Sequence, residues 1–184
     1  CEISFIGPSP EAMGLLGDKI SAKKLAREVG TPIFPGTEDA VEDVDEAVAV
    51  AQEIGFPVIV KAAAGGGGRG MRIVREASEL RGAIESASSE ALAAFGSGAV
   101  YVEKFLEKAR HVEVQCLGDS HGNAIHLFDR DCSSQRRHQK LIEEAPAPAV
   151  DPVKRLETAE AAARLLREAE YCGAATVEFL MDAN

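Results

Sequence analysis

The 184-residue sequence predicts a protein of mixed helices and strands. Hydrophobic residues make up 46% of the chain but aromatic residues only 5%, with no tryptophan, so the core should consist of Val, Ile, Leu and Ala. That balance suits an α/β protein. Segments with strand periodicity also alternate with segments of helical periodicity, and two pairs of strands are joined by turn-forming residues.

Two helices flank a proline-containing linker. Asp18 stands where an N-cap would, and apolar residues follow at helical spacing until Gly30. Prolines within residues 31–37 break this helix and mark a domain boundary. Residues 44–54 then predict an amphipathic helix with an acidic outer face, which stops at Gly55.

A glycine-rich hairpin follows. Residues 58–60 predict a buried strand, residues 65–70 a flexible loop and residues 71–74 the returning strand. Two short helices are expected over 78–86 and 88–95, and a further strand over 100–102.

The pattern then changes to alternating strands. Apolar and polar residues alternate over 111–116, a turn covers 118–123, and a partner strand returns over 124–128. A long helix begins at Asp151-Pro152 and ends before Gly173. We expect its packed face to comprise Val153, Leu156, Ala163 and Leu166. The final strand should point Glu178 away from Phe179.

Charge and cysteine content narrow the function. A formal net charge of −10 disfavours nucleic acid or an anionic membrane as the main partner. The four cysteines form no CxxC pair, which favours free thiols in a reducing compartment, the cytosol or the interior of an organelle. No apolar run approaches the length of a membrane span. We expect both ends to be cut from a longer chain.

Lys61 and the glycine loop form the first candidate site. Consecutive glycines let backbone N–H groups approach phosphate oxygens, and Lys61 ends an aliphatic strand just before them. Neither the Walker pattern nor the dinucleotide pattern is present. The alternatives are a flexible hairpin tip and a lysine that extends to water and contributes little packing.

The segment 129–140 is the second candidate site. Its polar residues are too dense to form core, and Gln135 can bind hydroxyl groups. His138 and Lys140 lie two apart, so on an extended backbone they face the same anion. A solvated basic loop or a nucleic-acid patch is the alternative, which the excess of acidic residues disfavours.

Several motifs together resemble a known family. They are Gly7-Pro-Ser-Pro10, Gly17-Asp-Lys19, Val60-Lys61-Ala with Gly65 to Met71, Val102-Glu-Lys-Phe105, Arg110-His-Val-Glu-Val-Gln115, Arg130-Asp-Cys-Ser133, Gln135-Arg-Arg-His-Gln-Lys140 and Glu143-Glu-Ala-Pro146. In this order they resemble the biotin carboxylase component of biotin-dependent carboxylases, in the ATP-grasp superfamily. That family phosphorylates bicarbonate with ATP and carboxylates biotin through carboxyphosphate.

The resemblance implies an α+β fold of the ATP-grasp type. Residues 1–30 would end a preceding domain and form connecting helices, 31–104 would form the lid subdomain with the glycine-rich loop, and 105–184 would begin a larger antiparallel-sheet subdomain. It also implies Mg²⁺ or Mn²⁺, a biotinylated carrier domain, a carboxyltransferase, a homo-oligomeric parent, and the cytoplasm or the mitochondrial matrix. The acyl-CoA, pyruvate or urea substrate stays open.

The resemblance also implies a role for each matching residue. Lys140 and His138 would act in catalysis, and Glu178 would ligate the metal. The implied ATP-binding residues are Lys19, Lys61, Gly65, Gly66, Gly67, Gly68, Glu103, Lys104, Leu106, His111, Gln135, His138 and Leu180. As alternatives, His111 would be an ordinary sheet histidine and Glu178 a solvent-facing carboxylate.

The sequence differs from the family pattern at two positions, and it leaves two alternative functions open. Asp129 replaces a usual glutamate and Ser134 a usual apolar residue, which questions the local packing. Another ATP-grasp ligase, such as a carbamoyl phosphate synthase, is the rival enzyme, and the Gln135-to-Lys140 string argues against it. A nucleotide-binding module without turnover is the second rival.

Overall fold

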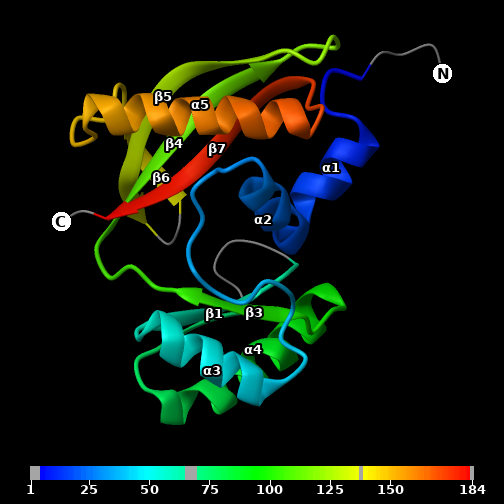
Figure 1. Ribbon diagram of the computed structural model, residues 1–184, viewed down its shortest axis with the longest axis vertical. Coiled ribbons are helices and arrows are strands. Elements are labelled where there is room, and N and C mark those ends of the chain that lie inside the picture. The colour runs from blue at the N-terminus through cyan, green and yellow to red at the C-terminus, as the bar shows by residue number, and fades with distance from the viewer. Residues whose placement is uncertain (1–4, 65–69, 137–138, 183–184) are drawn as a thin grey trace. The chain divides into compact units, whose positions relative to one another are not determined.

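The computed structural model describes residues 5–64, 70–136 and 139–182 (Figure 1). The chain divides into two compact units, which are described separately. One contains residues 18–20 and 33–107, and the other contains residues 1–17, 21–32 and 108–184. The three-part domain division expected from the sequence stays a prediction.

The first unit is a three-stranded antiparallel sheet covered by two helices. The strand order is β2-β1-β3, and α3 and α4 lie together on one face of the sheet (Figure 1). Val58, Val60 and Val102 are fully buried between the sheet and these helices. The elements are α3 (Val44–Ile54), β1 (Val58–Ala62), β2 (Met71–Val74), α4 (Ala77–Phe95) and β3 (Val100–Lys104).

Local sequence explains α3 well. The Asp43 side chain accepts a hydrogen bond from the Asp45 backbone N–H at 2.8 Å, which satisfies one of the free N–H groups of the first turn. Gly55 ends the helix with φ of 74°, a conformation that glycine adopts without steric strain. The predicted helix over 44–54 is therefore confirmed.

The prediction of two short helices between 78 and 95 was wrong. One continuous helix, α4, spans Ala77–Phe95. Ala87, at the expected break, is fully buried in the core of the first unit, so packing stabilises the helix through the serine-rich stretch around it. Gly96 ends α4 in the left-handed conformation, and its N–H donates to the Leu92 carbonyl.

The second unit is a four-stranded antiparallel sheet in the order β6-β5-β4-β7. Helix α5 lies along one face of this sheet (Figure 1), where Val114 and Cys116 pack against Ala159, Ala162 and Leu166. The antiparallel helix-and-sheet class predicted for the chain is thus confirmed. The strands are β4 (Ala109–Gly118), β5 (Ala124–Arg136), β6 (Gln139–Glu144) and β7 (Gly173–Asp182).

Helix α5 (Pro152–Glu168) begins as predicted but packs differently. The Asp151 side chain accepts hydrogen bonds from the first turn, and Pro152 occupies the first helical position. Val153 and Leu156 are 65% and 53% exposed, so their predicted place on the packed face was wrong. Small residues form that face because they let the helix approach the sheet closely: Ala159 and Ala162 are buried there with Leu166, and Ala163 is also buried.

In the polar segment 129–140, residues 129–136 and 139–140 are strand, and part of this strand is core. Asp129, Asp131 and Cys132 are buried, so the prediction that these residues cannot form core was wrong. Arg155 pairs with the Asp129 carboxylate: its Nε donates to Oδ2 at 3.2 Å and lies 3.0 Å from Oδ1, which is buried without a hydrogen-bond partner among the described residues. Ser134 is exposed, where a polar residue is tolerated.

The N-terminal segments form two helices, α1 (Pro10–Gly17) and α2 (Lys19–Glu28); periodicity had given the position of α2 alone. Within the described residues, no helix is long and apolar enough to cross a membrane. Three described cysteines, Cys116, Cys132 and Cys172, are free thiols, as expected.

Candidate functional site

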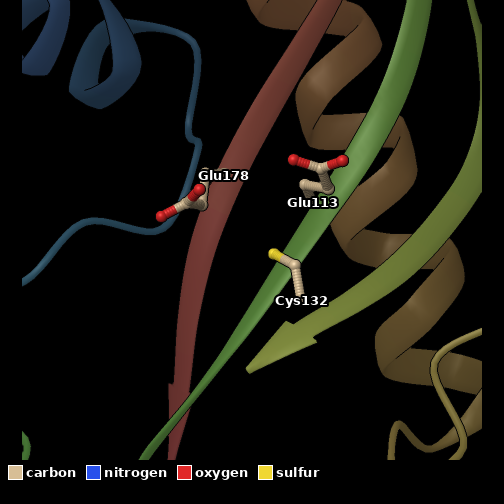
Figure 2. A group of neighbouring side chains, drawn as sticks. All are labelled: Glu113, Cys132 and Glu178. Carbon is tan, nitrogen blue, oxygen red and sulfur yellow. The ribbon is translucent and has the colours of Figure 1, made fainter. Parts of the chain in front are cut away.

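A row of charged side chains crosses the polar face of the four-stranded sheet. In the strand register, Glu113 on β4 lies opposite Arg130 on β5 and opposite Glu178 on β7. Neighbouring Val112 and Val114 are fully buried, and Val114 packs toward α5, so Glu113 points to the other face. Figure 2 shows Glu113, Cys132 and Glu178 gathered from three strands.

Lys140 joins the two carboxylates. Two like charges opposite each other on neighbouring strands repel, and a cation between them removes that repulsion. The Lys140 Nζ donates to Glu113 Oε2 and lies 3.1 Å from Glu178 Oε2. Burial alone would lower the pKa of Lys140, but hydrogen bonds to these two carboxylates raise it well above its ordinary value. Lys140 therefore stays an ammonium group.

Glu113 is held by two cations. Its side chain is only 4% exposed, and burial alone would raise its pKa. Hydrogen bonds from Lys140 and Arg130 outweigh the burial and hold the pKa of Glu113 below its usual value. The Arg130 Nε donates to Glu113 Oε1 at 2.7 Å. Glu113 is therefore a buried, ionised carboxylate that holds the Arg130 and Lys140 side chains in position.

His111 and Glu178 form the other end of the row. The His111 Nδ1 lies 3.1 Å from Glu178 Oε1, and His111 faces Leu180 in the β4–β7 register. Burial would raise the pKa of Glu178, but hydrogen bonds with His111 and Lys140 lower it. The structure thus brings Lys140, Glu178 and His111 together, as three of the residues expected at the site.

Gln135 and Cys132 border this cluster. The Gln135 Nε2 donates to the Cys132 carbonyl at 2.9 Å, and the Cys132 thiol donates to the His111 carbonyl at 3.4 Å. Burial raises the pKa of the Cys132 thiol, while the nearby Lys140 opposes this. The thiol is therefore protonated near neutral pH.

The residues fit one Mg²⁺ contact better than a closed metal cage. Ligand atoms of Glu113, Cys132 and Glu178 lie within 4.8 Å of one another, but a protonated thiol is a poor ligand for Mg²⁺. Glu113 already accepts from Arg130 and Lys140. Glu178 also has partners, but it is 43% exposed against 4% for Glu113, so it is the carboxylate more open to a metal ion.

A second cluster lies within the three-stranded unit. The Lys61 ammonium pairs with the Glu103 carboxylate, whose side chain is 8% exposed, across the β1–β3 pair. Burial and then the Lys61 ammonium lower the pKa of Lys19, while Glu103 opposes this. The alternative, in which Lys61 only extends to water, does not hold, because a buried carboxylate pairs with its ammonium.

The other expected ATP-binding residues are more dispersed. Lys104 Nζ donates to the Gly55 carbonyl at 2.9 Å, so this ammonium caps the end of α3. Leu106 and Leu180 are half-buried in different units. Gly65, Gly66, Gly67, Gly68 and His138 lie outside the described residues, and their roles stay predictions.

Sequence reasoning gave no role to Glu113 and Arg130, the centre of the row. Both stand in motifs that carried the resemblance, but their separation of 17 residues gives no local signal. Only the strand register places them side by side. Alternation did place Glu113 on the same face as His111, which is the signal that could have found it.

Comparison with known families identifies the class of protein to which this fold and charged sheet face belong. Residues 18–184 match the family described as "Carbamoyl-phosphate synthase L chain, ATP binding domain". The chain belongs to this family. Its relatives in the family are named biotin carboxylases and pyruvate carboxylases, so the resemblance predicted from the motifs is confirmed.

Two curated relatives illustrate the match. The chain is 52% identical to the biotin carboxylase of a Nostoc species over 182 residues, which is 99% of this chain and 41% of that protein. It is also 52% identical to the pyruvate carboxylase of Schizosaccharomyces pombe over 180 residues, or 98% of this chain and 15% of that protein. The chain thus spans less than half the length of either relative.

Two solved structures are similar. A Campylobacter jejuni biotin carboxylase, described as a beta-gamma-ATP complex, matches with a TM-score of 0.93 and 52% identity, over 99% of this chain and 41% of that one. The biotin carboxylase domain of Hydrogenobacter thermophilus 2-oxoglutarate carboxylase, with MgADP and bicarbonate, gives a TM-score of 0.91 and 45% identity. This second match covers 98% of this chain and 40% of that one.

Proposed function

We propose that this chain supplies the ATP- and metal-binding part of a biotin carboxylase, which uses ATP and bicarbonate to carboxylate biotin on a carrier protein. The observation that carries the proposal is the row of charges across β4, β5 and β7, with Lys140 between Glu113 and Glu178. Relatives named biotin carboxylase support it.

Lys140 has the right properties to act on an anion. Phosphoryl transfer depends mainly on positioning and on neutralising charge, with little covalent work for the protein. A permanently charged ammonium meets this need, and Lys140 is 31% exposed, so a substrate can reach it. We assign Lys140 to the bicarbonate or to the transferred phosphoryl group, with His138 beside the phosphates.

Glu178 would hold Mg²⁺ or Mn²⁺ at this face. When bound, the metal would supply positive charge to neutralise the phosphate groups. Glu178 keeps its ionised form because His111 and Lys140 lower its pKa. His111, Gln135 and Leu180 would then contact the nucleotide from the same sheet.

The three-stranded unit would hold the rest of the ATP. Lys61 and Lys19 carry the charge that phosphate oxygens require, and Glu103, Lys104 and Leu106 would contact the adenine. For Lys61 to bind phosphate, its ammonium must share or leave the Glu103 carboxylate that holds it. Gly65 to Gly68 would cover the phosphates.

The remaining partners follow from the family. A biotinylated carrier domain, a carboxyltransferase and a homo-oligomeric assembly would complete the enzyme. The mouse and human relatives are named mitochondrial. We keep the cytoplasm or the mitochondrial matrix as the predicted compartment.

The test uses the full-length protein that contains this chain. We expect phosphate release from ATP that requires both bicarbonate and biotin. Lys140→Met should lower turnover by about tenfold to a hundredfold, because a charge-assisted contact contributes about 1.5–3 kcal/mol. Lys154→Met is the matched control, since Lys154 is 73% exposed on α5 and pairs there with Glu157, away from the row of charges. ATP hydrolysis that ignores biotin would contradict the proposal.

A carbamoyl phosphate synthase activity is the second candidate, because the matching family carries that description. Such an enzyme would also use bicarbonate, but it would need an ammonia donor in place of biotin. Adding ammonium to the same assay separates the two: stimulation by ammonium and not by biotin would favour the synthase. A protein that binds ATP without any turnover would favour the simple binding module.

A further inference from the structure

Arg130 contacts three other side chains on the polar sheet face, and the proposed function gives it no role. Its Nε donates to Glu113 Oε1 at 2.7 Å, and its Nη2 lies 2.5 Å from the same oxygen. Nη2 also donates to Gln115 Oε1 at 3.0 Å, and Nε lies 3.6 Å from Glu143 Oε2. One side chain on β5 thus contacts groups from both neighbouring strands.

The contact with Gln115 extends the connection to β7. The Gln115 amide accepts from Arg130 through its oxygen and donates through Nε2 to the Ala175 carbonyl at 3.0 Å. Arg130 therefore has a fixed position between two strand pairs. Only a planar guanidinium can direct Nε and Nη2 at one carboxylate oxygen and also reach the amide.

The geometry assigns to Arg130 the role of a positioning residue for Lys140, acting through Glu113. Both contacts from Arg130 fall on Oε1 of Glu113, which leaves Oε2 for the Lys140 ammonium. Arg130 also neutralises the charge of Glu113. Within this row, Glu178 is then the carboxylate that balances the charge of Lys140. The Lys140 ammonium stays in place to meet an anionic substrate or phosphate.

Loss of Arg130 should disturb this arrangement in a defined way. Two buried or half-buried carboxylates, Glu113 and Glu178, would share one ammonium. Lys140 would be drawn deeper toward Glu113, and its contact with Glu178 would lengthen. The reaction should slow while ATP affinity changes little, because Arg130 itself contacts no substrate in this assignment.

The test rests on the proposed function and uses the full-length protein. We expect Arg130→Met to lower kcat about tenfold or more while the KM for ATP changes less than about twofold. Arg130→Lys keeps the positive charge but loses the planar guanidinium with its two N–H donors, so it should recover only part of kcat. Arg110→Lys is the control, since Arg110 pairs with Asp131 at 3.0 Å in the same sheet and is not part of the row.

A double-mutant cycle separates positioning from a general structural role. If Arg130 acts through Glu113, Arg130→Met should add less than about twofold to the loss already caused by Glu113→Gln. Equal losses in both backgrounds would overturn the assignment. So would full activity of Arg130→Lys or Arg130→Met.

A crystal structure of Arg130→Met keeps the inference independent of the proposed reaction. We expect the Lys140 Nζ to Glu178 Oε2 distance to grow beyond the 3.1 Å of the native chain. An unchanged position of Lys140 would overturn the inference. If the native enzyme shows no biotin-dependent turnover, the proposed function fails and this structure alone decides the role of Arg130.

Discussion

The two units share one plan but use it differently. Each is an antiparallel sheet with helices on one face, α3 and α4 on the three-stranded sheet and α5 on the four-stranded sheet. On the three-stranded sheet, Lys61 and Glu103 from two paired strands form an ion pair, and the charges of both act on the nearby Lys19 ammonium. On the four-stranded sheet, Arg130, Glu113, Lys140, Glu178 and His111 form one connected network.

This difference predicts how each group of charges responds when a ligand binds or a residue is replaced. One ion pair can be exchanged for contacts with a ligand, because breaking it frees one lysine. In the larger network each member supports the next, so removing one charge moves several others. The smaller cluster therefore suits binding and release, and the larger one suits fixed positioning.

The largest effect should come from breaking the pair in the three-stranded unit. Lys61→Met should weaken ATP binding by about tenfold to a hundredfold, since it removes a charge-assisted contact. It should also lower the free energy of unfolding by about 1–3 kcal/mol, because the 8% exposed Glu103 loses this ammonium. Calorimetry with ATP and denaturant unfolding of the full-length protein measure the two effects.

The double variant Lys61→Met/Glu103→Gln sharpens this result. Replacing the carboxylate by a neutral amide should restore most of the lost stability but not the ATP affinity. Unchanged ATP binding in Lys61→Met would remove the phosphate role of Lys61. An unchanged free energy of unfolding in Lys61→Met would mean that the ion pair with Glu103 does not stabilise the fold.

An intermediate effect is expected in the network at acid pH. Partners lower the folded-state pKa of Glu113 and of Glu178 against the opposing effect of burial. A lowered folded pKa means that the stabilisation is complete above the ordinary value of 4.5 and is lost as the pH falls through the lower folded value. Denaturant unfolding between pH 7 and pH 3 should therefore show stability falling below about pH 4.5.

Glu113→Gln tests whether Glu113 causes this dependence of the free energy of unfolding on pH. The variant should be less stable near neutral pH and should lose less stability on acidification, because one of the titrating carboxylates is gone. Glu157→Gln, at a 60% exposed position on α5, serves as the control and should keep the native slope. An identical slope in Glu113→Gln would exclude Glu113 as a source of the acid sensitivity.

The smallest effect concerns the helical layer of the three-stranded unit. A Cβ at Gly82 in α4 would meet nothing within 4 Å, so Gly82→Ala should stabilise the protein by about 0.5–1 kcal/mol. Gly36→Ala is the opposing case, because its Cβ would lie 2.2 Å from the Val102 carbonyl oxygen. The midpoint temperature of thermal unfolding should rise for Gly82→Ala and fall for Gly36→Ala. A lower midpoint for Gly82→Ala would contradict the packing of α4.

Local signals determined much of the fold and part of the site. The helix α3, the hairpin strands β1 and β2 and the start of α5 follow from apolar periodicity, an N-cap aspartate and turn residues close in sequence. Lys61 was recognised because it stands beside the glycine-rich segment. Motif resemblance identified the family and singled out Lys140, His111 and Glu178.

Tertiary structure decided the rest, because packing and strand register join residues that are far apart in sequence. Ser86 to Ser89 continue one helix since Ala87 is buried in the core, and Val153 and Leu156 stay exposed since alanines form the close contact with the sheet. Asp129 is buried because Arg155 pairs with it. Glu113 and Arg130 become the centre of the site only when β4 and β5 pair, since no local pattern shows which charges will face each other.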